Sequence, residues 1–208
     1  MKTRITGGLF IALVCLSGQA VRGQKPGDVH PQTLSDVRKL YDAGKYQQVI
    51  GASAEDPRVL FLRAQSYEKL SLSNEAGQVY TQLAGRPEPD PWREIGRSAV
   101  ALMSSDPAGA LEAANQAIAL DGALPEAYFQ QGIALNARQD LAGSAAAFQK
   151  ASDLDPAWAY AHYYAGLAYS KVKRVDLTER HFQAFLRLAP QAPERPGVQS
   201  ILRTLNRR

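Results

Sequence analysis

Few side chains of this sequence have types and spacing that suit catalysis or metal binding. His30, His162 and His181 are the three histidines. The last two fall on two predicted helices that pair with each other, so their imidazoles are expected to come close. Two imidazoles without a third ligand make a poor zinc site. The sequence therefore predicts no metal centre, and the two histidines are interpreted as packed or surface residues.

The carboxylates and the glycines form no catalytic motif either. Asp153 and Asp155 lie near the predicted end of a helix, where they are expected to serve the turn before Pro156. Paired-carboxylate chemistry would need a facing group from elsewhere. The sequence contains no glycine loop of P-loop spacing and no G-x-S-x-G nucleophile elbow. We therefore expect a protein that is not an enzyme and that carries no cofactor.

The first twenty residues have the pattern of a secretory signal peptide. Lys2 and Arg4 form a basic start, residues 9–16 are apolar, and Gly18 and Ala20 fit the small-residue cleavage pattern. The apolar run is too short to span a bilayer, which takes about 20 residues. We predict cleavage after Ala20 and an exported protein, periplasmic or extracellular. An uncleaved, amphipathic or partly buried N-terminal segment is the alternative.

Cys15 is the only cysteine and lies inside this apolar run. Bacterial lipoprotein signals place a small residue directly before the anchored cysteine, whereas Val14 precedes Cys15. Cys15 also comes early relative to the apolar core, so a lipid anchor is the less favoured interpretation. Cleavage after Ala20 leaves a mature chain without a thiol, which excludes disulfides, cysteine metal ligands and a cysteine nucleophile.

The elements that position these residues repeat every 34 residues, in registers that start at Pro57, Pro91, Pro125 and Ala159. The eighth and twentieth positions hold small residues, where two crossing helices need their backbones to approach. Large residues beside them fill the space next to the crossing, and a proline near the end stops the second helix. The positions that carry this pattern are Ala64, Tyr67, Ala76, Gly132, Ser144, Phe148, Pro156, Gly166, Tyr169, Phe182 and Pro190.

This pattern resembles the tetratricopeptide repeat family, most clearly over residues 125–156. The resemblance covers residues 32–190 and implies an all-α, right-handed superhelical solenoid of antiparallel helical hairpins. The family's leucine at position seven is absent. The unit that starts at Pro91 has alanines where bulk is usual, so we expect it to be the least stable unit. Residues 43–50 resemble the turn of a further, truncated unit.

The sequence thus divides into a signal peptide (1–20), a flexible linker (21–31), a repeat domain (32–190), and a linker with a C-terminal capping helix (191–208). Helical pairs are predicted over 32–52, 57–84, 91–120, 125–153 and 159–188, which makes about four full units and the truncated first one. The last helix, predicted over about 197–206, is expected to cap the open end of the array.

In the family, the concave inner face is lined by the first helix of each unit, at positions two, five, nine, twelve and thirteen. In the first full unit these positions hold Arg58, Phe61, Gln65, Glu68 and Lys69. Over all units they give an apolar stripe of Phe61, Trp92, Ile95, Phe129, Ile133, Tyr160, Tyr163 and Leu167. Such an exposed stripe predicts a groove for an apolar peptide segment or an amphipathic helix. The alternative is that these side chains pack between adjacent units, or that the C-terminal helix fills the groove.

Position five is apolar or aromatic in every unit, so the Lys, Asn and Arg set with which tetratricopeptide co-chaperones hold carboxylates is missing. We therefore predict a non-catalytic adaptor or scaffold of the cell envelope that binds a protein or peptide and no nucleic acid. Self-association into a homo-oligomer is one alternative. Contact with a membrane surface is another, because residues 171–208 hold nine Lys/Arg against three Asp/Glu.

Overall fold

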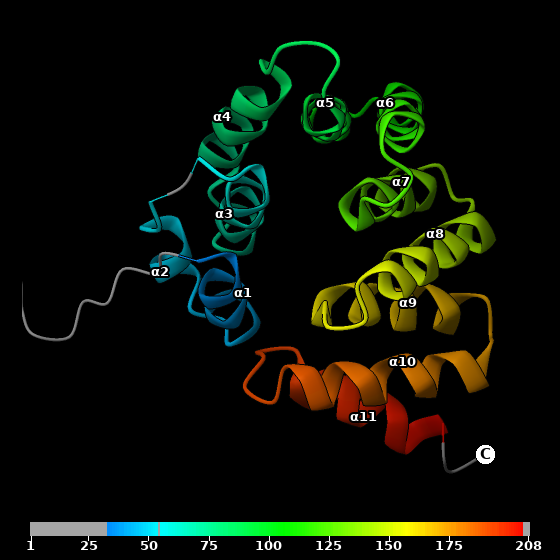
Figure 1. The fold of residues 1–208 in the computed structure, drawn as a ribbon. Helices are drawn as coiled ribbons and strands as arrows, with labels where there is room; N and C mark the ends of the chain where they lie inside the picture. Colours follow the sequence, from blue (N-terminus) through cyan, green and yellow to red (C-terminus); the bar gives the residue numbers. More distant parts are fainter. Residues whose placement is uncertain (1–32, 54, 206–208) are drawn as a thin grey trace, which may run out of the picture.

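The computed structural model describes residues 33–53 and 55–205, and in this part of the chain it contains eleven α-helices and no strand (Figure 1). The helices are α1 (Leu34–Asp42), α2 (Tyr46–Ile50), α3 (Pro57–Lys69), α4 (Ser73–Ala84), α5 (Pro91–Met103), α6 (Pro107–Leu120), α7 (Pro125–Ala137), α8 (Leu141–Leu154), α9 (Ala159–Lys171), α10 (Val175–Leu188) and α11 (Arg195–Leu205). The predicted all-α architecture of sequential antiparallel helices is confirmed. The predicted signal peptide and the linker over 21–31 lie outside the described residues.

Aspartates explain why several helices begin where they do. The side chains of Asp56, Asp90, Asp106 and Asp140 accept hydrogen bonds from backbone N–H groups in the first turns of α3, α5, α6 and α8. These N–H groups have no partner within the helix, so the caps satisfy them. In the first three of these helices a proline follows the aspartate, at a position where a missing N–H is tolerated.

The turns inside the helical pairs repeat one backbone conformation that the sequence did not indicate. Ser71, Ser105, Gln139 and Lys173 follow each other at intervals of 34 residues, and each has a positive φ of 58–66°. This left-handed conformation lets the next residue donate its backbone N–H to a carbonyl five residues earlier, as from Leu72 to Tyr67 at 2.9 Å. Each first helix is thereby ended and the chain reversed.

The two helices of a pair cross where the sequence predicts small residues. The Ser144 hydroxyl on α8 donates a hydrogen bond of 2.9 Å to the Gly132 carbonyl on α7. A Cβ atom added to Gly132 would come within 2.8 Å of the Phe148 ring, and one added to Gly166 within 2.6 Å of the Phe182 ring. Glycine at the eighth position therefore lets the aromatic ring of the second helix lie directly on the first helix.

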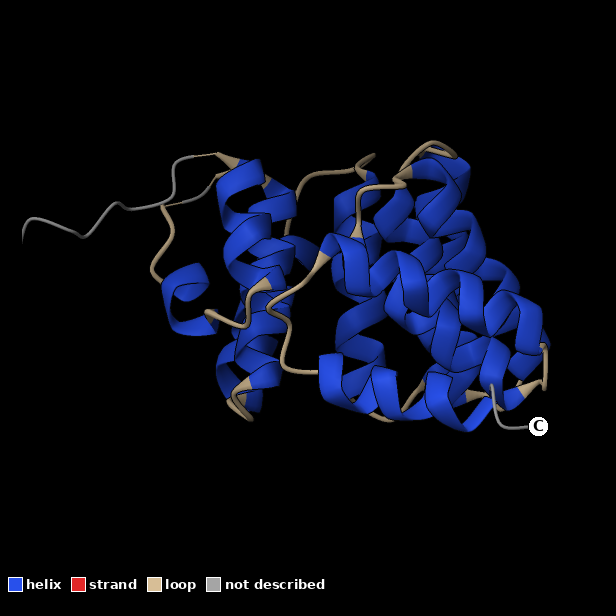
Figure 2. Cartoon of the chain, turned by 90° about the horizontal axis from the view of Figure 1, so that it is seen from below, coloured by secondary structure: helices blue, strands red, loops and turns tan. Residues whose placement is uncertain are grey.

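The array curls until its two ends meet (Figure 1). Each helix packs mainly on its neighbours in the chain, and α11 packs on α10. Figure 2 shows the same array from below, with helices joined by loops over the described residues. A side chain on α1 contacts Asp155 in the α8–α9 loop, one on α2 contacts Tyr160 at the start of α9, and one on α3 contacts Glu194 in the loop before α11. We call this closed arrangement the ring.

The unit built on α5 and α6 is packed by small side chains, as its sequence indicates. Ala110, Ala114 and Ala117 on α6 are completely buried, yet each fills little volume. No helix within the described ranges is both long and apolar enough to cross a membrane.

Candidate binding site on the inner face of the ring

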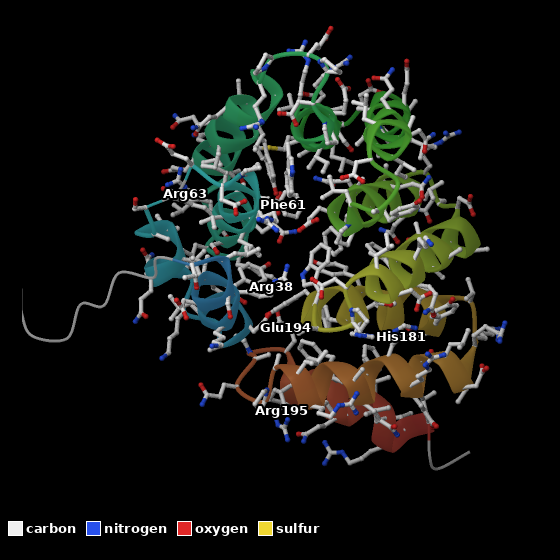
Figure 3. All side chains as sticks on the ribbon, in the orientation of Figure 1. Arg38, Phe61, Arg63, His181, Glu194 and Arg195 are labelled. Carbon is white, nitrogen blue, oxygen red and sulfur yellow. The ribbon has the colours of Figure 1, made fainter. Side chains whose placement is uncertain are left out.

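The predicted apolar stripe lies on the first helices of the pairs and points into the ring. Figure 3 shows Phe61 on α3 directed towards the interior. Five of the eight residues are buried, namely Phe61, Trp92, Ile95, Phe129 and Tyr160. The other three, Ile133, Tyr163 and Leu167, are half-buried and pack against the core.

The expectation that this stripe is exposed is wrong for the five buried residues. Phe61 on α3 and Phe129 on α7 meet at a ring-centroid distance of 6.3 Å with perpendicular planes, although α4, α5 and α6 separate their helices in the chain. Trp92 lies 6.1 Å from Phe61, and Trp158 lies 4.8 Å from Phe129. The ring is narrow enough for aromatic side chains on its two sides to touch, which closes the open groove that the sequence suggested. Partner binding by the stripe stays a prediction.

A second set of contacts joins the ends of the array. The Glu194 carboxylate, in the loop before α11, accepts hydrogen bonds from the Lys69 ammonium at 2.6 Å and from the Tyr160 hydroxyl at 2.8 Å. The Tyr160 hydroxyl also lies 3.2 Å from the Tyr46 hydroxyl on α2. We call Lys69, Tyr160 and Glu194 the clasp. Burial alone would raise the pKa of Glu194, but the hydrogen bonds from Lys69 and Tyr160 lower it below its usual value.

Next to the clasp, an ion pair between Arg38 on α1 and Asp155 in the α8–α9 loop also closes the ring. The Arg38 guanidinium lies 5.9 Å from the centre of the Trp158 ring system. Nearby carboxylates on α1 and α7, Asp42 and Glu126, each have a buried oxygen without a hydrogen-bond partner. Burial raises the pKa of both Asp42 and Glu126 to about 7, although Arg38 opposes the shift in each case.

A cavity of about 210 Å³ lies between α3, α4, α5, α7 and α9 and borders the aromatic contacts at Phe129. We call it the inner cavity. Its lining includes two of the predicted site residues, Phe129 and Ile133. It also includes Gln65, Glu68 and Met103 from the inner-face positions of α3 and α5. The repeat register places these three side chains on the inner face. The predicted apolar stripe leaves out Gln65 and Glu68 because they are polar, and Met103 is not among its eight residues. The inner cavity is therefore part apolar and part polar.

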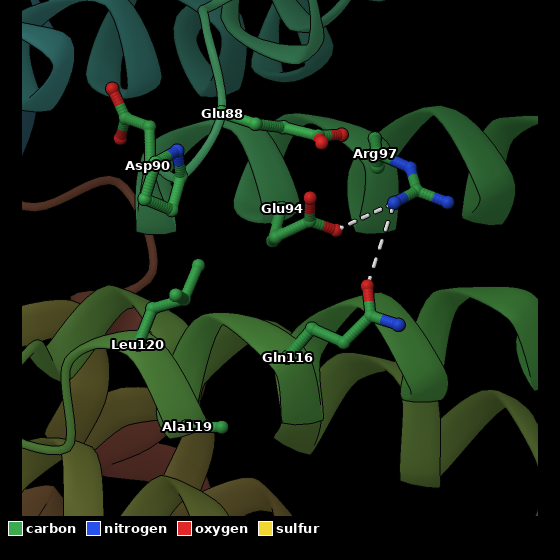
Figure 4. Close-up of a pocket in the computed structure, with 8 residues that line it drawn as sticks. Glu88, Asp90, Glu94, Arg97, Gln116, Ala119 and Leu120 are labelled. Atoms are coloured by element: carbon green, nitrogen blue, oxygen red, sulfur yellow. Dashed lines mark hydrogen bonds and ion pairs between the residues drawn. The ribbon is translucent and has the colours of Figure 1, made fainter.

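A further recess of about 360 Å³ lies between α5, α6 and the loop before α5 (Figure 4). Its polar side chains already bind each other, because the Arg97 guanidinium donates to Glu94 at 2.9 Å and to Gln116 at 3.4 Å. Leu120 forms part of its wall and is about half exposed. Because these polar side chains are already paired within the protein, the recess has fewer free groups for binding a ligand than the inner cavity has.

The predicted approach of His162 and His181 is confirmed, because their Nδ1 atoms lie 3.0 Å apart. The Nε2 atom of His181 bonds to the side-chain oxygen of Gln149 at 2.7 Å, and its ring stacks on Tyr169. Burial lowers the pKa of both imidazoles, that of His181 to about 4, with the nearby His162 as the next cause. Over the described ranges, no three His, Cys, Asp or Glu side chains are grouped as a metal site.

Fold and inner face together define a TPR-like array of helical hairpins, and comparison with solved structures agrees. The TPR domain of OM64 from Arabidopsis has 20% sequence identity and a TM-score of 0.52, over 55% of this chain and 94% of that domain. The structure of MamA from residue 41 to its end, from Desulfovibrio magneticus RS-1, has 22% identity and a TM-score of 0.46, over 75% of this chain and 97% of that chain. At these identities the likeness concerns the fold alone. No family model and no curated protein matches the sequence.

Proposed function

We propose that this protein is an exported, non-catalytic scaffold that binds a peptide segment of another protein on the inner face of its ring. The observation that carries this proposal is the arrangement of the first helices of the pairs. They direct aromatic and apolar side chains inward around a cavity, and arrays of this fold generally serve as protein-interaction scaffolds. Export rests on the signal-like pattern of residues 1–20.

A peptide can reach this face only if the ring opens or if the peptide enters beside the half-buried residues. The clasp and the Arg38–Asp155 pair join the ends of the array through polar contacts that are partly exposed to solvent. Loss of one such charge-assisted contact costs about 1–2 kcal/mol. Binding energy from a peptide segment can offset such a loss, so we expect binding to be coupled to loosening of the clasp.

Selection of displayed peptides against the full-length chain, followed by calorimetry with the selected sequences, tests this function. Replacing the half-buried Tyr163 or Ile133 by Ala should weaken binding at least tenfold, because both side chains lie on the inner face. Replacing Val175, an exposed residue at the start of α10, by Ala is the matched control and should leave affinity unchanged. Equal affinity for all three variants, or failure to select any peptide, would count against an inner-face binding site.

Self-association, the other class of function considered, receives less support. Within the described ranges, the large exposed hydrophobic residues are Met103, Leu120 and Val175, which lie on three different helices. Stable dimers bury a contiguous apolar patch on each subunit. A monomer by light scattering is the expected result, and a concentration-independent dimer would favour self-association instead. For export, the mass of the protein isolated from its native cell should lack residues 1–20.

A further inference from the structure

The inner cavity is too small to hold a typical cofactor, but it is large enough to hold one amino-acid side chain. Its volume of about 210 Å³ lies below the roughly 300–1,000 Å³ of pockets that hold drug-sized molecules. It is built by three successive first helices, α3, α5 and α7, with contributions from α4 and α9. If a peptide binds along the inner face as proposed above, one of its side chains meets this cavity.

An unsatisfied acceptor faces the inner cavity. Gln65 is 7% exposed, it lines the cavity, and its Oε1 atom is buried without a hydrogen-bond partner. A buried acceptor without a donor is destabilising, and natural proteins satisfy such groups with protein, water or ligand. A ligand that brings an N–H group to Gln65 removes this deficit.

The charge in the inner cavity is negative. Glu68, one helical turn after Gln65, is the charged residue of the lining, and part of its surface is exposed to solvent. Burial raises the pKa of Glu68, and the hydrogen bond from Tyr80 and the charge of Lys69 oppose this shift. The neighbouring Lys69 turns to the clasp, where its ammonium binds Glu194 at 2.6 Å. Burial and the Glu68 charge both raise the pKa of Tyr80, so this hydroxyl stays protonated beside the carboxylate. The field of Glu68 therefore favours a cation in the cavity.

Aromatic and aliphatic side chains complete the wall. Phe129 and Tyr164 meet edge to face at a centroid distance of 5.1 Å, and both line the cavity together with Ile133 and Met103. Aromatic rings attract cations, and the aliphatic stem of Lys or Arg packs well on apolar walls. An anionic side chain would be repelled by Glu68, and an apolar one would leave Gln65 Oε1 without a donor.

From the position of Gln65, Glu68 and the aromatic wall, we infer that the inner cavity holds a cationic side chain, Lys or Arg, of the peptide segment bound by the ring. Glu68 pairs with the charge, Gln65 Oε1 accepts an N–H, and the aromatic rings of Phe129 and Tyr164 border the cation. This inference rests on the proposed function only in assigning the cationic side chain to a bound peptide. The preference of the cavity for a cation follows from its own lining.

Met103 provides a direct reporter, because Met1 and Met103 are the only methionines of the chain. The full-length protein is labelled at its methionine methyl groups, and the Met103 signal is assigned with Met103→Leu. N-acetyl-arginine amide and N-acetyl-lysine amide should shift this signal saturably at millimolar concentrations. N-acetyl-citrulline amide, which keeps the shape of the arginine probe and lacks its charge, should bind at least tenfold more weakly.

Variants locate the effect. Glu68→Gln should weaken binding of the arginine probe at least tenfold, and Gln65→Leu should weaken it several-fold. Glu112→Gln, which removes an exposed carboxylate from α6, should leave it unchanged. Because Glu68 is exposed, its replacement should not unfold the protein, and circular dichroism checks this. Equal binding of citrulline and arginine probes, no shift of Met103, or undiminished binding by Glu68→Gln would overturn the inference.

These outcomes separate the inference from the proposed function. In one outcome, selected peptides bind the Tyr163→Ala variant more weakly, but the Met103 signal does not shift when the cationic probes are added. This outcome would refute the cavity assignment and leave the proposed function standing. A cationic probe that binds through Glu68, with no peptide selected, would uphold the cavity and refute the peptide scaffold.

Discussion

Lys69 and Glu194 lie 125 positions apart in the sequence, yet their side chains meet at 2.6 Å and join the third helix to the loop before the last one. The carboxylate also accepts the Tyr160 hydroxyl. Both charged side chains are mostly buried, with exposed fractions of 23% and 17%. The contact ties the ends of the array to each other and makes the opening of the ring measurable.

Replacing Glu194 by Gln should loosen the ends of the array. The variant loses a charge-assisted hydrogen bond, a change worth about 1–2 kcal/mol of unfolding free energy. Hydrogen exchange should quicken in α2, whose Tyr46 hydroxyl contacts the clasp residue Tyr160, and remain unchanged in α7 and α8. Glu112→Gln serves as the control, and unchanged exchange throughout would show that the clasp does not hold the ring.

Replacing Glu126 by Gln should stabilise the protein at high pH and have little effect at low pH. Burial raises the folded-state pKa of Glu126 from 4.5 to about 7. The folded state therefore holds this proton more tightly than the unfolded chain, and the associated stability is present below about pH 4.5 and lost as the pH rises through 7. The variant should gain up to about 3 kcal/mol relative to the wild type between pH 5 and 8. Urea denaturation of the wild type and the variant at pH 4.5 and at pH 8 measures this gain. A difference in unfolding free energy that is the same at the two pH values would contradict the prediction.

His181 should remain neutral until the solution is strongly acidic. Its folded-state pKa is lowered from 6.5 to about 4, so below pH 6.5 the unfolded chain binds a proton that the folded state does not. Stability is therefore expected to fall by up to about 3 kcal/mol between pH 6.5 and 4. Proton NMR of the imidazole signals gives the pKa directly. A His181 that titrates near 6.5 would show that the burial of its imidazole, the main cause of the lowered pKa, does not persist in solution.

Adding a methyl group at Gly166 should disturb the crossing of α9 and α10. The new Cβ would come within 2.6 Å of the Phe182 ring, which is itself completely buried. Overpacking of this kind costs about 1–3 kcal/mol. Gly197→Ala on α11 is the matched control, because nothing lies within 4 Å of its new Cβ, and it should be neutral or stabilising by up to about 1 kcal/mol. Equal thermal denaturation midpoints for the two variants would contradict the close crossing.

Glycine at the left-handed turn position should stabilise the protein. Gln139 has φ of 66°, a conformation that is strained for a residue with a Cβ atom by about 1 kcal/mol. Gln139→Gly relieves this strain, although greater freedom of the unfolded chain offsets part of the gain. The melting temperature should rise by up to about 2–4 °C for a chain of this length. Gln131→Gly, inside α7, is the control and should lower it.

The helices and their crossings could be predicted from the sequence because they depend on contacts between residues close in the chain. Gly132, Ser144 and Phe148 lie within one helical pair, so a single 34-residue period determines their meeting. The left-handed turns could not be predicted, because residues of different types, such as Ser71 and Lys173, have the same backbone conformation there.

The closure of the ring could not be predicted in the same way. Its contacts join residues more than a hundred positions apart, such as Arg38 with Asp155, and no repeat position encodes them. The inner-face pattern predicts an open groove, whereas Phe61 and Phe129 touch across the ring. The acidic half of the inner cavity was missed because Gln65 and Glu68 interrupt the apolar pattern.

The contacts that close the ring also limit the number of helical pairs that it can contain. An open array of hairpins can grow by gene duplication, since each added unit stacks on the last. Here one more 34-residue unit would push the loop that carries Glu194 away from Lys69 and leave Tyr46 without Tyr160. Duplication within this gene should therefore yield a less stable protein, and relatives with the same closure should keep the same number of units.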